Sequence, residues 1–133
     1  GRANILKDGS DCAVIASGIM VAEALEAAKL LEAEGINIAV IDPDTVKPLD
    51  EETVIAYAKK CGAIVTAENA NVVGGLGAAV CECVCQTYPV PVKRVGVQDM
   101  FGEVGDMAYL KERFGLTAGV IAANVRDVIR CRV

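Results

Sequence analysis

The stretch that most constrains the fold of this chain runs from Ala63 to Tyr88 and reads AIVTAENANVVGGLGAAVCECVCQTY. It opens with a short apolar run, Ala63 to Thr66, of the length and type that suits a β-strand buried on both faces. A polar break follows, and a glycine-rich corner then leads into about three helical turns of apolar sequence before Pro89. The order of strand, loop, glycine corner and helix is typical of an α/β protein.

The corner contains Gly74, Gly75 and Gly77, and two interpretations of it compete. Glycines let the first helical turn approach the sheet without a Cβ in the way, and they also leave N–H groups free to bind an anion. The sequence GGLG matches neither the dinucleotide-binding pattern nor the phosphate loop. We therefore favour close packing of the helix, with weak phosphate binding as the alternative.

The helix after this corner is apolar around nearly its whole circumference, with Glu82 and Gln86 as its polar residues. Such a helix is either central in its domain or covered by a second body, and the small size of the chain favours the second body. Within this helix, Cys83 points about 200° away from Cys81, whereas Cys81 and Cys85 share a face. This geometry excludes a metal bound by all three, so we expect all six cysteines of the chain to be free, metal-free thiols.

Composition narrows the functional classes. The chain has 133 residues, which predicts a single domain over residues 1–133. Its net charge of −5 is scattered, which argues against nucleic acid as a partner, and the absence of histidine removes the commonest general base and metal ligand. With no signal peptide before Ala3 and no apolar run long enough to cross a bilayer, we expect a cytoplasmic protein.

Along the chain, short apolar runs alternate with helical patterns. Ala3–Leu6 and Cys12–Ala16, joined by an Asp-Gly turn signal, predict a β-hairpin. Further strands are expected at Ile36–Ile41, Ala63–Thr66 and Val92–Val97. Helices are expected at Ile19–Glu34, at residues 50–61, after the glycine corner, at Asp106–Phe114 and at Ala118–Cys131.

Capping residues mark several helix ends. Ser17 is predicted to cap the first helix and Gly35 to end it, Asp50 to cap the second and Gly62 to end it, and Thr117 to cap the last.

The alternation predicts a three-layer α/β/α domain with a mixed sheet of about five strands, one of them antiparallel. Ligands of such sheets lie beyond the carboxyl ends of the strands, where this chain carries Asp42, Glu68 to Asn71, and Asp99 to Glu103. Glu68 and Glu103 could act as an acid and base pair, but we favour structural roles for both, as helix caps or backbone acceptors. The residues alone therefore predict an α/β domain without a visible catalytic set.

Five motifs in order resemble the C-terminal domain of transketolase, especially the separately encoded C-terminal subunit of split transketolases. The resemblance extends more distantly to deoxyxylulose-phosphate synthase and the beta subunit of pyruvate dehydrogenase. It covers essentially the whole chain from Ala3 and is carried by KPLD at 47–50, AIVTAE at 63–68 with GGLG at 74–77, VKRVGVQD at 92–99, FGE at 101–103 and GLT at 115–117.

The resemblance implies a domain without catalytic, cofactor-binding or metal-binding residues of its own. Thiamine diphosphate and Mg²⁺ would lie between a pyrophosphate-binding and a pyrimidine-binding domain, which are the implied partners within a homo-oligomer, a dimer. This chain would pack beside them and extend the interface. The residues expected to contact an anion or the neighbouring domains are Glu68, Asn71, Gly74, Gly75, Gly77, Asp99, Phe101, Gly102 and Glu103.

Two departures from the family pattern stand out, because the family often has histidine where this chain has Ala70 and serine where it has Val104. We expect the chain to be excised from a longer one that transfers a two-carbon ketol unit between sugar phosphates. One alternative is the same domain of a 2-oxoacid dehydrogenase beta subunit or of deoxyxylulose-phosphate synthase. Another is a non-enzymatic interaction or regulatory module.

Overall fold

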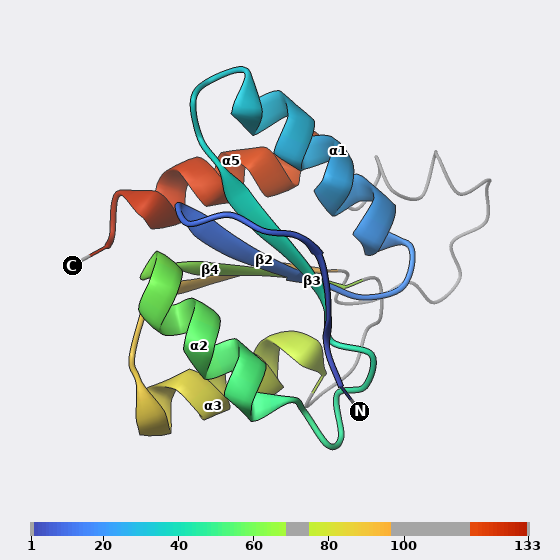
Figure 1. The fold of residues 1–133 in the computed structure, drawn as a ribbon, viewed down its shortest axis with the longest axis vertical. Coiled ribbons are helices and arrows are strands. Elements are labelled where there is room, and N and C mark those ends of the chain that lie inside the picture. The colour runs from blue at the N-terminus through green and yellow to red at the C-terminus, as the bar shows by residue number, and fades with distance from the viewer. Residues whose placement is uncertain (1, 69–74, 97–117, 133) are drawn as a thin grey trace.

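The computed structural model describes residues 2–68, 75–96 and 118–132 (Figure 1). In chain order the elements are β1 (Asn4–Lys7), β2 (Cys12–Ala16), α1 (Met20–Glu32), β3 (Ile38–Asp42), α2 (Glu51–Cys61), β4 (Ile64–Glu68), α3 (Leu76–Thr87), β5 (Val92–Gly96) and α5 (Ala118–Ile129). The helix expected at Asp106–Phe114 and the cap expected at Thr117 lie outside the described residues.

The strands form one five-stranded sheet in the order β1-β3-β2-β4-β5. β1 pairs antiparallel with β3, and the other three pairings are parallel. Helices α1 and α5 cover one face of the sheet, and α2 and α3 cover the other (Figure 1). The predicted three-layer α/β/α fold with one antiparallel strand is therefore confirmed.

The predicted hairpin between the first two strands is wrong, because β1 pairs with β3 rather than with its neighbour in sequence. Gly9 makes this arrangement possible. A Cβ on Gly9 would lie on the carbonyl group of Ile38, so the chain crosses the start of β3 in direct backbone contact. The N–H groups of Ser10 and Asp11 then donate to the Asn37 carbonyl oxygen at 3.2 and 2.9 Å, and β2 begins on the far side of β3.

The Asp8 carboxylate holds this crossing against α2. It accepts hydrogen bonds from the Lys60 ammonium at 2.7 Å, the Tyr57 hydroxyl at 2.8 Å and the Gly9 N–H at 2.9 Å. These donors, Lys60 foremost, lower the pKa of Asp8 to about 2. Burial, followed by the bond to Asp8, raises the pKa of Tyr57 to about 12.

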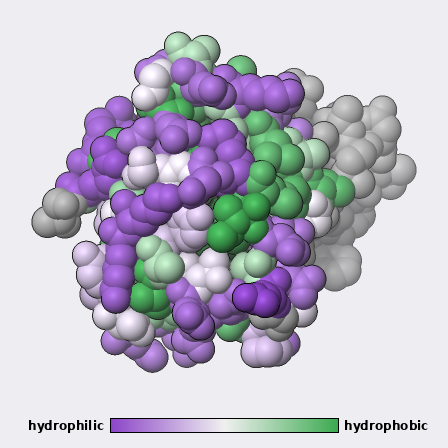
Figure 2. All heavy atoms as spheres, in the orientation of Figure 1, coloured by the Kyte–Doolittle hydropathy of each residue, from purple (hydrophilic) through white to green (hydrophobic). Residues whose placement is uncertain are grey.

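As the edge strand, β1 is only partly covered by helices. Ile5 is 50 % exposed and Leu6 is 46 % exposed, although successive strand residues point to opposite faces of the sheet. Figure 2 shows hydrophobic surface gathered over β1 and the adjoining part of α1. Both faces of the sheet thus have apolar side chains in contact with solvent at this edge.

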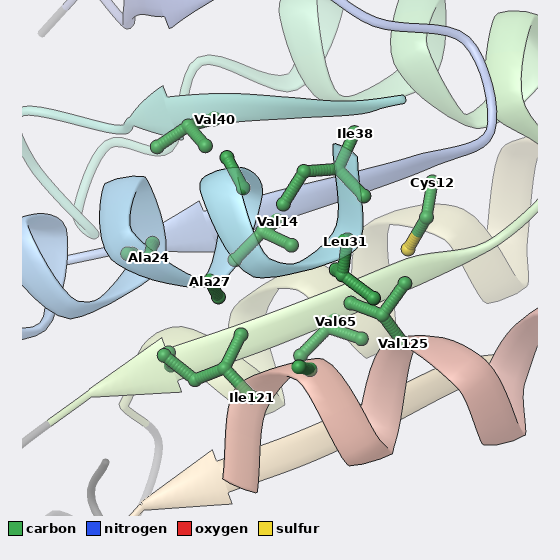
Figure 3. Packing of buried hydrophobic residues seen from close by; sticks show 14 of the residues in the cluster. Cys12, Val14, Ala24, Ala27, Leu31, Ile38, Val40, Val65, Ile121 and Val125 are labelled. Atoms are coloured by element: carbon green, nitrogen blue, oxygen red, sulfur yellow. The ribbon is translucent and has the colours of Figure 1, made fainter. Parts of the chain in front are cut away.

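Side-chain alternation along the buried strands builds two separate cores. In β2, Ala13 and Ile15 face α2 and α3, whereas Val14 faces α1 and α5. Figure 3 shows the second of these cores, where Leu31 of α1 and Ile121 of α5 lie on the same side of the sheet. These two cores hold the sheet between the helices and so fix the positions of the strand ends, where the candidate site lies.

The helix ends follow the capping signals in part. The Asp50 carboxylate accepts the Thr53 N–H at 3.2 Å, and Gly62 ends α2 in the left-handed conformation at φ 73°, as predicted. Gly35 follows α1 at φ 79°. Ser17 is not the cap of α1, because Ile19 occupies that position without a side-chain hydrogen bond. Within the described ranges, no helix combines the length and apolar character needed to span a membrane.

Candidate functional site

The described candidate residues meet where β4 and β5 end and α3 begins. Glu68 is the last residue of β4, Gly75 is the N-cap residue of α3, and Gly77 lies in its first turn. The Gly77 N–H donates to Glu68 Oε2 at 3.3 Å. The structure therefore brings Glu68, Gly75 and Gly77 together at one corner.

The sequence explains why a strand residue has to cap this helix. Gly75 has no side chain with which to accept an N–H group, and α3 has no acidic residue in its first turn. The Glu68 carboxylate reaches across from β4 and places a negative charge at the positive end of the helix dipole. This agrees with the capping role that we favoured for Glu68 over an acid and base role.

Gly77 allows side chains of β4 and β5 to lie close to the start of α3, as the sequence suggested. A Cβ at this position would lie 2.5 Å from Arg94 Nε and 3.1 Å from Thr66 Oγ1. Thr66 and Arg94 are register partners on β4 and β5, and both side chains lie close to the start of α3, Thr66 buried and Arg94 exposed. The absent side chain of Gly77 gives the Arg94 side chain its place beside the helix.

Thr66 is the buried polar residue of this corner. Its side chain is 1 % exposed, and its Oγ1 atom has no hydrogen-bond partner among the described residues. Gly96 completes the corner, because a Cβ there would lie 3.2 Å from the Glu68 carbonyl oxygen and 3.3 Å from its Cγ. A small residue at position 96 leaves the backbone of Glu68 unobstructed.

Sequence reasoning missed Thr66, Arg94 and Gly96. The two-residue period of a strand carried a signal for them. Thr66 and Glu68 are two residues apart and share a face of β4, and Arg94 and Gly96 share a face of β5 in the same way. Recognising them required the parallel register of the two strands, which a single sequence does not provide.

The other predicted site residues are distributed differently. Asn71, Gly74, Asp99, Phe101, Gly102 and Glu103 lie outside the described residues, as does any pairing of Glu68 with Glu103. Asp42, at the end of β3, accepts the Asp44 N–H at 2.9 Å and shapes the turn that follows. The described corner consists of one carboxylate, one guanidinium and a helix start, which suits packing and charge recognition.

Helix α3 is only partly covered by this domain. Its buried residues are Leu76, Gly77, Val80, Cys83 and Val84, whereas Cys85 is exposed and Cys81 is half-buried. All six cysteines are free thiols in the structure. Across the described ranges, no group of three or more cysteine, aspartate or glutamate side chains is placed to hold a metal ion.

We predict that Gly77→Ala brings no net stabilisation of the domain, because of Arg94. The new methyl group displaces the arginine side chain, which offsets the gain of about 1 kcal/mol that alanine brings to a helix. In an Arg94→Ala background this conflict is absent, so the same substitution should be more favourable by about 1 kcal/mol. Urea denaturation of the wild type, both single variants and the double variant measures this coupling. Strictly additive effects would show that Arg94 does not compete with a side chain at position 77.

The fold defines the chain as a three-layer α/β domain built on a five-stranded mixed sheet with one antiparallel strand. Residues 1–121 match the family described as "Transketolase, C-terminal domain". The chain belongs to this family, and the resemblance noted in the sequence is thereby confirmed.

Relatives and solved structures agree with this assignment. The chain is 55 % identical over 128 residues to the 6-deoxy-6-sulfo-D-fructose transketolase subunit of a Clostridium species, covering 96 % of this chain and 40 % of the relative. It is 42 % identical over 129 residues to 1-deoxy-D-xylulose-5-phosphate synthase of Heliobacterium modesticaldum, covering 96 % of this chain and 20 % of that protein.

A structure described as "Split gene transketolase, inactive beta4 tetramer" superimposes with a TM-score of 0.91 at 47 % identity, covering 99 % of this chain and 42 % of that one. Transketolase from Campylobacter jejuni shares the fold, with a TM-score of 0.64 at 24 % identity over 94 % of this chain and 18 % of the other. The chain thus spans between 18 % and 42 % of the length of these proteins.

Proposed function

We propose that this chain is the C-terminal domain of a cytoplasmic, thiamine-diphosphate-dependent transketolase that transfers a two-carbon ketol unit between sugar phosphates. The observation that carries the proposal is the 55 % identity to a transketolase subunit over nearly the whole chain. The role of this domain is structural: it supports the interface with a pyrimidine-binding domain and a pyrophosphate-binding domain or subunit. Residues 1–133 act as a single domain of the longer polypeptide.

The described residues do not fit the cofactor. Magnesium and a diphosphate require clustered oxygen ligands, and no such group of acidic side chains occurs in the described part of the chain. At the start of α3, where a diphosphate oxygen would accept N–H groups, the Glu68 carboxylate already accepts the Gly77 N–H. We therefore assign thiamine diphosphate and Mg²⁺ to the other domains of the enzyme.

Uncovered surface supports the interface role. The apolar side chains of Ile5 and Leu6 at the sheet edge are about half exposed, which is typical of a surface that packs against another body. The split-gene relative described as a tetramer supports a homo-oligomer, for which we propose a dimer as the basic unit. The candidate contacts are Glu68, Asn71, Gly74, Gly75, Gly77, Asp99, Phe101, Gly102 and Glu103.

The proposal predicts that residues 1–133 alone neither bind thiamine diphosphate nor transfer ketol units. Calorimetry with thiamine diphosphate and Mg²⁺ should show no binding, because the chain does not fit the cofactor. Adding the thiamine-binding domains should produce ketol transfer from a ketose phosphate to an aldose phosphate. A reconstituted enzyme without the C-terminal domain serves as the control and should be less stable or less active.

Micromolar cofactor binding or turnover by the isolated chain would show that our assignment of the cofactor to the other domains is wrong. Failure of the reconstituted protein to use any sugar phosphate would overturn the transketolase assignment.

Deoxyxylulose-phosphate synthase is the second candidate, because the synthase of Heliobacterium modesticaldum is 42 % identical to this chain. That enzyme class differs in using a 2-oxoacid as the donor. Supplying the reconstituted enzyme with pyruvate and an aldose phosphate in one assay, and with a ketose phosphate in another, separates the two activities. Carbon dioxide release from pyruvate would favour the synthase.

A further inference from the structure

A small apolar groove lies at the end of α3 opposite the candidate site. It has a volume of about 290 Å³ and is lined by Cys81, Val84, Cys85, Pro89, Val90 and Val92. With a rise of 1.5 Å per residue, Cys81 and Cys85 lie about 6 Å and about 12 Å beyond Gly77 along the helix. The groove is therefore distinct from the corner at Glu68 and Gly77.

The two groove cysteines are neighbours on the helix surface. Cys81 and Cys85 are four residues apart, a spacing that places Cβ atoms about 6 Å from each other. Cys85 is exposed and Cys81 is half-buried, so solvent reaches the pair. No carboxylate lines the groove, and its remaining side chains are apolar.

None of the other four cysteines is both accessible to solvent and next to a second thiol on the same helix. Cys12, Cys61 and Cys83 are buried, and burial raises the pKa of each thiol, to about 11 for Cys61 and Cys83. Cys131 is exposed, but the residue one turn before it is Asp127, whose carbonyl oxygen accepts the Cys131 thiol at 3.6 Å. An accessible pair of thiols thus occurs at Cys81 and Cys85.

We propose that Cys81 and Cys85 together form a binding site for a trivalent arsenic compound, in which both thiol sulfurs bind one arsenic atom. Sulfur ligands in an apolar groove select soft centres over magnesium or calcium, which require oxygen ligands. An arylarsonous acid carries two As–OH groups. Each is replaced by an As–S bond, the thiol protons leave in two water molecules, and arsenic stays trivalent, so no oxidant or reductant takes part.

The test uses phenylarsine oxide, which forms the arylarsonous acid in water. Added in equal amount to the folded chain, it should form a one-to-one adduct by intact mass. The adduct should protect two thiols from maleimide, and peptide mapping should place both protected thiols at Cys81 and Cys85. Because the second As–S bond forms within one molecule, Cys85→Ser should retain the reagent about a hundredfold more weakly in competition with glutathione.

Cys131→Ser is the matched control, since it also removes an exposed thiol, and it should leave the adduct unchanged. Cys81→Ser should match Cys85→Ser, and circular dichroism should confirm that all three variants are folded. The proposal is overturned if the adduct resists glutathione equally in Cys85→Ser, if it is lost in Cys131→Ser, or if the wild type forms none.

Discussion

Replacing Gly9 with alanine is expected to destabilise the domain by about 3 kcal/mol or more, which is enough to unfold much of the protein under mild denaturing conditions. The new Cβ would lie on the carbonyl group of Ile38 and 2.7 Å from the Ala39 amide nitrogen. Both contacts are to backbone inside a sheet, so neither can move aside as a flexible side chain does. Urea denaturation followed by circular dichroism measures the loss.

Gly35→Ala is the control for Gly9→Ala. Gly35 has a positive φ of 79°, but a Cβ there would meet nothing within 4 Å. Its expected cost is the left-handed strain alone, about 1–2 kcal/mol. If Gly9→Ala is as stable as Gly35→Ala, the close crossing of β3 is not present in solution.

Leu31→Ala is expected to cost about 3 kcal/mol, because it removes a fully buried side chain from the core between α1, α5 and the sheet (Figure 3). The cavity would border Val125, which belongs to a helix far away in the sequence. The midpoint of urea denaturation should fall without a large change in the slope.

The adjacent Leu30 provides the matched control. It has the same side chain on the same helix but is 47 % exposed, so Leu30→Ala should change stability by about 0.5 kcal/mol or less. Equal losses at the two positions would show that α1 is rotated from the orientation described.

The parts of the fold that could be predicted from the sequence are those encoded locally. Asp50 and Gly62 bound α2 as expected, since a cap and a left-handed stop act within one helical turn. The apolar runs of β2, β3 and β4 were recognisable because burial on both faces removes polar residues from them.

The pairing of β1 could not be predicted from local signals. The Asp-Gly sequence at Asp8 is a good turn signal, but the deciding contact joins Gly9 to Ile38, which is distant in the sequence. Similarly, Glu68 was identified from its place at the end of a strand and Gly77 from the glycine corner. Arg94 and Thr66 became visible only through the register of β4 and β5. Non-local pairing was the missing information in both cases.

Helices α1 and α5 cover the same face of the sheet, and the Arg126 guanidinium binds the Glu34 carboxylate at 2.9 and 2.5 Å across 92 residues of sequence. During synthesis on the ribosome, α1 therefore emerges long before the helix that packs beside it. Until α5 leaves the exit tunnel, the apolar side of α1 and the strands beneath it remain uncovered, and the loop that must close spans 92 residues. The apolar surface of α1 in the nascent domain is thus buried only after α5 has been synthesised.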